Sequence, residues 1–260
     1  MQKEIEKFKN ATLLEGMTSI RALVEARMGK NPENDRRIKS IAYAAESEKK
    51  LSKELSWLRH RAKEWDFPIF PLPAEEIARI TTGTTHGGIV ADVTERTIPP
   101  LEALLPSILK NGFYVMIEGI EDPYNFGYAL RSLYALGVSG IVLDERNWMS
   151  AAGVVARASA GASELLPLYV AKPTEAALAF RDAGYRVACA DVRTDLLLQD
   201  ADLTFPLFLI VGGEKRGISR ALFDLCDFAV RIPYGRDFPA ALSAASAATI
   251  LGYEIARQNK

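Results

Sequence analysis

Six short apolar runs recur between residues 113 and 232, and no other feature of this 260-residue sequence constrains the fold as strongly. The runs are rich in β-branched and aromatic residues, and stretches with helical spacing lie between most of them. Apolar strands that alternate with helices predict a largely parallel sheet that is covered on both faces. The expected strands are at 113–117, 139–143, 167–170, 185–190, 207–211 and 228–232, and a last helix is expected at 242–258.

The residues before this repeat form a different pattern. Helices and strands alternate there over shorter stretches, which is typical of a small αβα unit. The segment RTIPP at 96–100 has the composition of a linker. We therefore predict a domain at 1–95, a linker at 96–110 and an α/β domain at 111–260. The elements expected in the first domain are helices at 19–28, 47–65 and 73–80 and strands at 38–42 and 67–70.

The strand at 113–117 stops abruptly at EGIEDP, and a helix follows. We place Asn125 at the N-cap of that helix and Arg131 at the start of its second turn. Because helical side chains lean toward the N-terminus, Arg131 can reach back over the carboxyl end of the strand, where open α/β sheets bind ligands. An arginine on such a helix is more often a surface ion-pair partner, so this stretch does not define a site by itself.

Two later strand ends carry a signal of the same kind. The run LFLIV leads straight into GGE at 212–214, so the backbone can approach a ligand closely beside a carboxylate. The strand at 228–232 ends in Ile-Pro, and a helix of small residues opens near residue 242. The three strand ends line one pocket if their strands are neighbours in the sheet.

The composition argues against several classes of protein. There is no apolar run of about 18 residues that could form a transmembrane helix. Two histidines and two scattered cysteines make a metal site unexpected. The start of the chain, MQKEIEKFKN, lacks the apolar core of a signal peptide, and Cys189 and Cys226 lie in apolar surroundings. We therefore expect a cytoplasmic protein without a membrane partner.

Basic residues cluster in the first domain. RRIK occupies 36–39, and several lysines and arginines follow along the helix at 47–65. A phosphate backbone could use such a patch. The same residues alternate with glutamates, so a solvated helix face is the simpler interpretation when the helix is taken alone.

Three stretches of the α/β region carry a specific pattern. They are DPYNFG at 122–127 with Arg131, RASAGASELLP at 157–167, and Gly212, Gly213, Glu214 and Gly217. With these residues, the three strand ends resemble, in order and spacing, motifs one, two and three of the SpoU/TrmH family of RNA ribose methyltransferases, within the SPOUT superfamily. HGGIVA at 86–91 more loosely resembles the end of the ribosomal-protein-like substrate-binding domain that many members carry.

The resemblance implies a fold, a cofactor and a set of site residues. The fold would be α/β, with a mostly parallel sheet and a C-terminal trefoil knot, preceded by a small αβα substrate-binding domain. S-adenosyl-L-methionine would bind in the knot, and a homodimer would complete the sites. The expected activity is 2'-O-ribose methylation, with ribosomal RNA as the first candidate substrate and transfer RNA as the second. The implied catalytic residues are Asn125, Arg131, Glu214 and Ser243, and the implied cofactor-binding residues are Gly212, Gly213, Ile232 and Leu242.

The chemistry of these residues limits their roles. An arginine guanidinium stays protonated in proteins, so we expect Arg131 to clamp phosphate and stabilise the developing alkoxide instead of acting as a base. Motif three departs from the family, because ALS stands at 241–243 where Ser-Leu-Asn is usual. This departure keeps open a second interpretation, an RNA-binding protein of the same fold with weak or no catalysis. A third is an unrelated α/β nucleotide-binding enzyme.

Overall fold

The computed structural model describes residues 11–144, 151–213 and 217–260. The chain divides into two compact units. The first contains the described residues up to 97 together with 151–165, and the second contains the described residues of 98–144 and 166–260. In the described part of the chain, no helix is long and apolar enough to cross a membrane. The domain boundaries predicted from the sequence stay a prediction.

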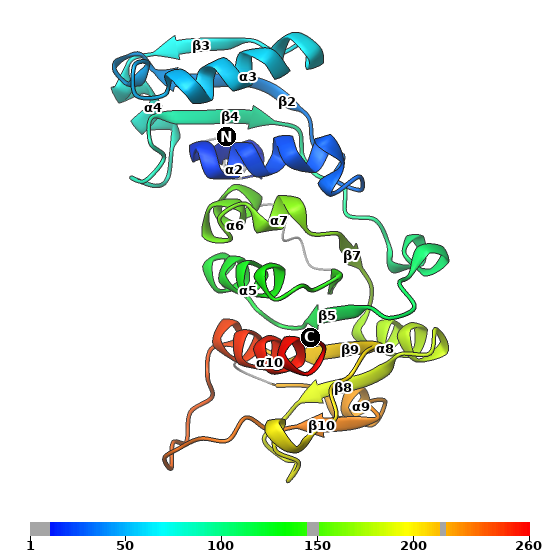
Figure 1. Ribbon diagram of the computed structural model, residues 1–260. Helices are drawn as coiled ribbons and strands as arrows, with labels where there is room; N and C mark the ends of the chain where they lie inside the picture. The colour runs from blue at the N-terminus through cyan, green and yellow to red at the C-terminus, as the bar shows by residue number, and fades with distance from the viewer. Residues whose placement is uncertain (1–10, 145–150, 214–216) are drawn as a thin grey trace. The chain divides into compact units, whose positions relative to one another are not determined.

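The first unit is built on a four-stranded sheet in the order β1-β4-β2-β3 (Figure 1). The central strand β4 pairs antiparallel with β1 and with β2, and β3 runs parallel to β2 at the edge. The helix expected at 47–65 starts later, because a short 3-10 turn precedes it. The strands are β1 (Leu13–Glu15), β2 (Ile38–Ala44), β3 (Ile69–Leu72) and β4 (Ile89–Val93), and the helices are α2 (Gly16–Glu25), α3 (Ser52–Trp65), α4 (Ala74–Ile80), α6 (Ala152–Ala158) and α7 (Ala162–Leu165).

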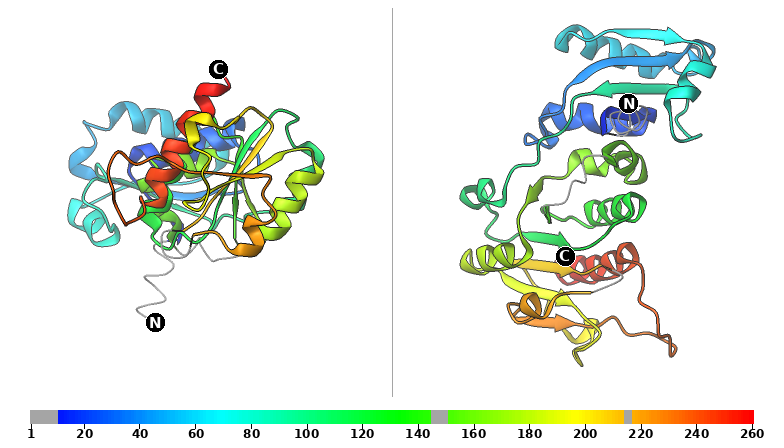
Figure 2. Two further views of the ribbon diagram at one scale, coloured as in Figure 1. Left: turned by 90° about the horizontal axis from the view of Figure 1, so that it is seen from below. Right: turned by 180° about the vertical axis from the view of Figure 1, so that it is seen from behind.

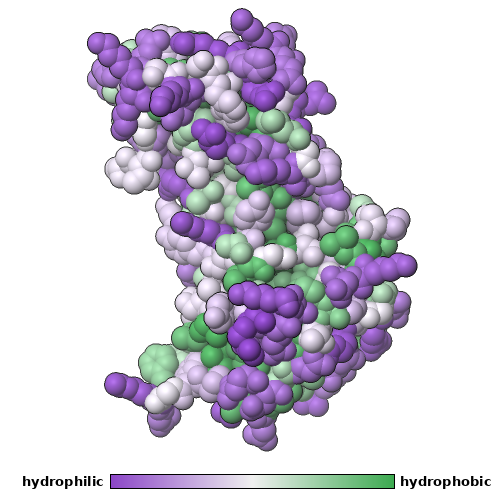
Figure 3. All heavy atoms as spheres, viewed as in Figure 1, coloured by the Kyte–Doolittle hydropathy of each residue, from purple (hydrophilic) through white to green (hydrophobic). Residues whose placement is uncertain are grey.

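The core of the first unit lies between the sheet and its helices. Leu55 and Leu58 of α3 are fully buried and pack with Leu23 of α2 and with Ile41 of β2. The opposite face of α3 carries the lysines and arginines noted in the sequence. The surface of this unit is mainly hydrophilic in the view of Figure 3.

A buried ionic cluster fixes α7 in the first unit. Arg36 and Glu164 are both buried, and their side chains approach to 3.6 Å between Nη1 and Oε1. Asn34 donates to Glu164 Oε2 at 2.9 Å, and Arg96 donates to the Ser163 carbonyl at 2.5 Å. Because Glu164 neutralises buried guanidinium charge, residues 162–165 are tied to the loop before β2 and the loop after β4.

The second unit is built on a six-stranded sheet in the order β10-β8-β9-β5-β6-β7, and every pairing in it is parallel. The prediction of an α/β fold with a mostly parallel sheet is confirmed. The predicted strands at 113–117 and 207–211 match the observed ones, and the other four differ by one or two residues at an end. The strands are β5 (Phe113–Ile117), β6 (Gly140–Leu143), β7 (Leu168–Val170), β8 (Arg186–Ala190), β9 (Leu207–Val211) and β10 (Phe228–Val230).

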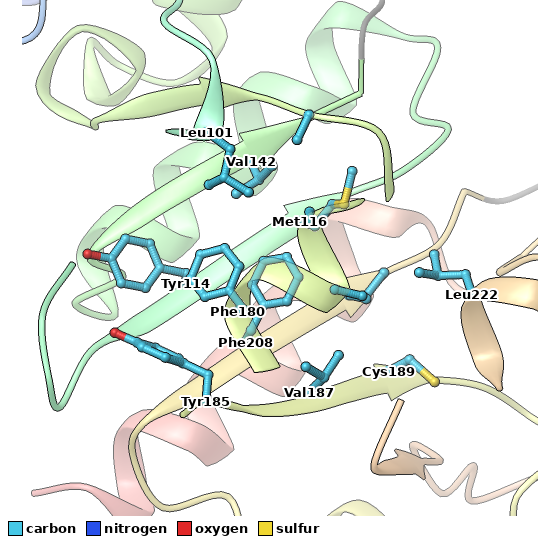
Figure 4. Packing of buried hydrophobic residues seen from close by; sticks show 14 of the residues in the cluster. Leu101, Tyr114, Met116, Val142, Phe180, Tyr185, Val187, Cys189, Phe208 and Leu222 are labelled. Atoms are coloured by element: carbon cyan, nitrogen blue, oxygen red, sulfur yellow. The ribbon is translucent and has the colours of Figure 1, made fainter. Parts of the chain in front are cut away.

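Helices cover both faces of this sheet (Figure 2). On one face lie α8 (Pro173–Asp182) and α9 (Arg220–Phe223), over an aromatic core in which the rings of Phe180 and Phe208 stack with centroids 4.0 Å apart (Figure 4). On the other face lie α5 (Pro123–Ala135) and α10 (Ala244–Gln258), which pack against each other. A Cβ added at Gly252 would lie 3.1 Å from Leu136, so this glycine lets α10 sit close to α5.

Candidate functional site

A cavity of about 470 Å³ opens at the carboxyl ends of β8, β9 and β10. Its walls are the turns that follow these strands and the loop that leads from β10 into α10. All four of the predicted cofactor-binding residues lie along this one cavity. They are Gly212, Gly213, Ile232 and Leu242. Their role as cofactor contacts stays a prediction.

The glycine pair that follows β9 allows the chain to turn in a confined space. A Cβ at Gly213 would lie 2.5 Å from the Gly119 carbonyl oxygen, and one at Gly212 would lie 2.7 Å from the carbonyl carbon of Gly217. Real Cβ atoms essentially never approach within 3.0 Å, so any side chain would push these turns apart. The turn after β5 therefore rests directly on the turn after β9, which brings the first two motifs together.

The strand β8 lies between β9 and β10, and its carboxyl end also lines the cavity. Asp191 follows this strand, and Arg193 donates to its carboxylate through Nε at 2.8 Å and Nη2 at 2.5 Å. These hydrogen bonds from the Arg193 side chain hold the pKa of Asp191 below its ordinary value, although burial opposes them. The cavity wall thus carries an ionised carboxylate that was not predicted from the sequence. The charged pair of Asp191 and Arg193 directly after an apolar strand was the sequence feature that could have predicted it.

The start of α5 differs from the prediction. The N-cap is Asp122 and not Asn125, because the Asp122 carboxylate accepts hydrogen bonds from the backbone N–H groups of Tyr124 at 3.2 Å and Asn125 at 3.3 Å. Pro123 occupies the first helical position, where its missing N–H costs nothing. Asn125 therefore lies in the first turn of α5 and is half-buried.

Arg131 lies two turns further along α5, and its side chain is exposed. Within the described ranges, no hydrogen bond or ion pair holds its guanidinium. Neither Asn125 nor Arg131 lines the cavity at the ends of β8, β9 and β10. The third predicted catalytic residue, Glu214, lies outside the described residues.

Ser243 stands between the cavity and α10. It is the N-cap of that helix, which begins at Ala244 and not at the predicted residue 242. The Ser243 hydroxyl accepts a hydrogen bond from the Ser246 backbone N–H at 3.1 Å and lies 3.0 Å from the Ser246 hydroxyl. Its neighbours Leu242 and Ala244 both line the cavity.

These features define the class of the protein: it is an α/β protein whose ligand cavity lies outside the carboxyl ends of a parallel sheet. The model of the SpoU rRNA Methylase family matches residues 112–253. The chain therefore belongs to the SpoU rRNA methylase family, as the three motifs indicated. Family membership argues against an unrelated α/β nucleotide-binding enzyme.

Relatives and solved structures agree with this family. The chain is 31% identical over 225 residues to an uncharacterized tRNA/rRNA methyltransferase of Mycobacterium ulcerans (strain Agy99), and the match covers 85% of this chain and 70% of the relative. A solved RNA 2'-O ribose methyltransferase has the same fold, with a TM-score of 0.73, 19% identity and coverage of 95% of this chain and 88% of that one. The SpoU methyltransferase AviRb from Streptomyces viridochromogenes, solved in complex with the cofactor AdoMet, has a TM-score of 0.76 at 24% identity and covers 98% of this chain and 97% of its own.

Proposed function

We propose that this protein uses S-adenosyl-L-methionine to methylate ribose 2'-hydroxyl groups of RNA, with ribosomal RNA as the first candidate substrate and transfer RNA as the second. The observation that carries the proposal is the cavity formed around the glycine turn after β9, in a chain of the SpoU family. The motifs that resemble those of ribose methyltransferases support the choice of the 2'-oxygen.

The cavity fits the proposed cofactor in size and in chemistry. Its volume of about 470 Å³ lies within the range of small-molecule sites. Gly212 and Gly213 expose backbone that can approach a ligand, Ile232 and Leu242 offer apolar contact, and the Asp191 carboxylate can accept hydrogen bonds from hydroxyl groups. When bound, S-adenosyl-L-methionine supplies the methyl group on a positively charged sulfur.

The predicted catalytic residues would align the ribose and help it to lose a proton. Alignment in a closed site can lower a barrier by roughly 7 to 11 kcal/mol. In this proposal Arg131 clamps a phosphate and stabilises the developing alkoxide, since its planar fork matches phosphate oxygens. Asn125 orients the hydroxyl group, and Glu214 is the further catalytic residue that the family resemblance implies. The proton leaves to phosphate or water.

We infer a homodimer from the position of Arg131. Its helix α5 and the adjoining α10 expose large side chains beside it, and Tyr128 and Tyr253 are among the most exposed of them. Aromatic residues are enriched in protein–protein interfaces. A second copy that covered this α5–α10 face would bury these side chains. It would also bring Arg131 of one protomer to the cavity of its partner, although Arg131 does not line the cavity of its own chain.

We also infer the C-terminal trefoil knot that the family resemblance implies. Two observations support it. The chain leaves the edge strand β10 and then forms α10, which packs against α5 and so returns past β8 and β9 in the sheet order. Leu242, just before α10, lines the same cavity as Gly212 and Gly213, so this path also passes the turn after β9.

The first unit is proposed to bind the RNA substrate. Arg59 and Arg61 on α3 form ion pairs with Glu48 and Glu64. The lysines on and just before α3 have no ion pair with the described part of the chain, so their charge is available to a phosphate backbone. These lysines are Lys49, Lys50, Lys53 and Lys63.

A second candidate function is RNA binding with weak or no catalysis. The Ser243 hydroxyl, which stands where the family usually has an asparagine, already accepts the hydrogen bond that caps α10. A capping serine has less hydrogen-bonding capacity left for a substrate than an asparagine amide would have.

Two measurements on the full chain separate these candidates. Isothermal titration calorimetry with S-adenosyl-L-methionine tests cofactor binding, and tritiated methyl transfer to bulk ribosomal and transfer RNA tests the reaction. Methylation of a 2'-oxygen blocks alkaline cleavage of the neighbouring phosphodiester, so we expect the label in alkali-resistant dinucleotides. Label in mononucleotides would contradict ribose methylation, and cofactor binding without transfer would support the second candidate.

A further inference from the structure

The loop between β10 and α10 carries two neighbouring aromatic side chains, one of which lines the cavity. Tyr234 lines the cavity and is 39% exposed, and Phe238 is 56% exposed. Their ring centroids are 6.4 Å apart, with the ring planes inclined by 48°. The Tyr234 hydroxyl accepts a hydrogen bond from the Leu242 backbone N–H at 3.1 Å, which fixes this ring against the start of α10. We call Tyr234 and Phe238 the aromatic rim.

The surroundings of the aromatic rim are unlike those of a core. In the hydropathy view, the projecting loop carries apolar surface directly beside hydrophilic surface (Figure 3). Arg236 and Asp237 separate the two aromatic residues in the chain and are both exposed. Across the cavity, the turn after β8 contributes Val192, which is 76% exposed, and the half-exposed side chain of Arg193. The cavity wall therefore carries the Tyr234 ring and the Arg193 side chain, and the Phe238 ring lies beside Tyr234.

We propose that the aromatic rim is a stacking platform for an unpaired RNA base at or next to the methylated nucleotide. This inference rests on the proposed function, because a ribose that receives a methyl group at the cavity must have its base near the mouth. Unpaired bases in RNA complexes stack on aromatic side chains and on arginine planes, and both kinds of group are present here. Every base has a π-face, so the platform holds a nucleotide without selecting its identity.

RNA fits this rim better than a second copy of the chain does. Protein–protein interfaces bury about 800 Å² on each partner, whereas the aromatic rim consists of two side chains on a projecting loop. The rim also borders a cavity that must stay open to its substrate. Charge does not decide between the two occupants, because Asp191 neutralises Arg193 and Asp237 follows Arg236 in the same loop.

The test separates stacking from apolar contact by comparing two substitutions at one position. Phe238→Leu keeps apolar bulk but removes the π-face, and Phe238→Tyr keeps the π-face. The probe is a mixed-sequence single-stranded RNA oligonucleotide that carries 2-aminopurine, whose fluorescence falls when it stacks on a ring. Binding is measured with the full-length protein saturated with S-adenosylhomocysteine, which has no methyl group to transfer.

We expect Phe238→Leu to bind the oligonucleotide about 5- to 150-fold more weakly and to lose the fluorescence quenching, because base stacking accounts for that difference. Phe238→Tyr should retain both. Equal binding and quenching by the wild type and Phe238→Leu, or no quenching by the wild type, overturns the inference. A change in the sedimentation coefficient of Phe238→Leu also overturns it, because the rim would then contact a second copy.

The proposed function is tested separately in the same variants. Calorimetric binding of S-adenosyl-L-methionine should be unchanged in Phe238→Leu, since Phe238 does not line the cavity. If the wild type transfers methyl groups to RNA and Phe238→Leu binds RNA as tightly as the wild type, the stacking role of the aromatic rim is contradicted. The proposed function is then still supported. If the wild type neither binds the cofactor nor transfers a methyl group, the proposed function itself fails.

Discussion

Arg157 donates a hydrogen bond from Nη1 to Glu15 Oε2 at 2.5 Å and so joins α6 to the end of β1 within the first unit. Both side chains are largely buried. The Glu15 carboxylate also accepts hydrogen bonds from the backbone N–H groups of Thr82 at 2.7 Å and Gly83 at 3.1 Å. One carboxylate therefore connects three segments that are far apart in the sequence.

This arrangement predicts a loss of stability in acid. Burial raises the pKa of Glu15, but the hydrogen bonds from Thr82 and the charge of Arg157 together outweigh burial and leave the pKa below its ordinary value of 4.5. A carboxyl group of this kind stabilises the fold above its ordinary pKa, and the contribution disappears as the pH falls through the lowered value. We expect the urea midpoint of the wild type to fall as the pH drops below about 4.5, and to fall less steeply in Glu15→Gln.

A matched surface variant controls for the general effect of acid. Glu175 pairs with Lys172 at 3.0 Å, and both side chains are more than half exposed. Glu175→Gln should therefore follow the wild type at every pH. Identical pH dependence in Glu15→Gln and the wild type would show that the Glu15–Arg157 pair does not stabilise the fold.

The ionic cluster around Glu164 predicts a larger effect at neutral pH. Glu164→Gln leaves the buried guanidinium groups of Arg36 and Arg96 without their carboxylate. Removing one partner of a buried ion pair costs about 3 to 5 kcal/mol, and we expect a loss of that size in urea unfolding. The exposed pair of Arg79 and Glu76 is the control, since Glu76→Gln should cost less than about 1 kcal/mol. Equal losses in the two variants would contradict a stabilising role for Glu164.

The sequence predicted the elements that depend on local chemistry. The apolar runs at 113–117 and 207–211 were recognisable as strands because a strand buried on both faces needs an uninterrupted apolar sequence. The N-cap residue of α5 could also have been predicted correctly from the sequence. Both Asp122 and Asn125 are good caps, but Pro123 fits best at the first helical position, which assigns the cap to Asp122.

Long-range pairings lay beyond sequence reasoning. Residues 151–165 contain the short helices α6 and α7, and local sequence does not show which distant surface covers them. In the structure they pack with the first unit. The order of the strands in the sheet could not be predicted from the sequence either. Because β8 lies between β9 and β10, the Asp191–Arg193 pair enters the cavity, although the three motifs alone suggested only three strand ends.

The close contact between two turns makes Gly213 sensitive to substitution. In Gly213→Ala the new Cβ would meet the Gly119 carbonyl oxygen at 2.5 Å, so the turns after β5 and β9 must separate. We expect S-adenosyl-L-methionine binding to weaken by at least about tenfold in calorimetry, which corresponds to about 1.4 kcal/mol. The matched control is Gly235→Ala in the loop before α10, where a Cβ meets nothing within 4 Å. Cofactor affinity that is equal in both variants would exclude the cavity as the cofactor site.

A substitution of Arg131 tests its proposed role as a clamp on phosphate. Arg131→Lys keeps the positive charge but replaces the planar fork with a point charge. Removing one preorganised donor to a developing oxyanion typically lowers kcat by about 100- to 1,000-fold, and we expect a loss of at least about tenfold because the lysine keeps part of the interaction. Cofactor affinity should not change, since Arg131 is proposed to contact the RNA phosphate and the reacting oxygen and not the cofactor. Near-normal turnover of Arg131→Lys in the tritium assay would contradict a fork-shaped clamp.

Substitutions of Ser243 test whether the serine in place of the usual asparagine of motif three limits catalysis. Asparagine caps helices as well as serine does, so Ser243→Asn should keep the free energy of unfolding within about 0.5 kcal/mol of the wild type. It also adds an amide that can donate and accept hydrogen bonds at the edge of the cavity, and we expect kcat for methyl transfer to rise. Ser243→Ala separates the two effects, because it removes the hydroxyl that binds the Ser246 N–H and should cost about 1 kcal/mol of stability. If Ser243→Asn is as stable as the wild type but no faster, the serine is not what limits the reaction.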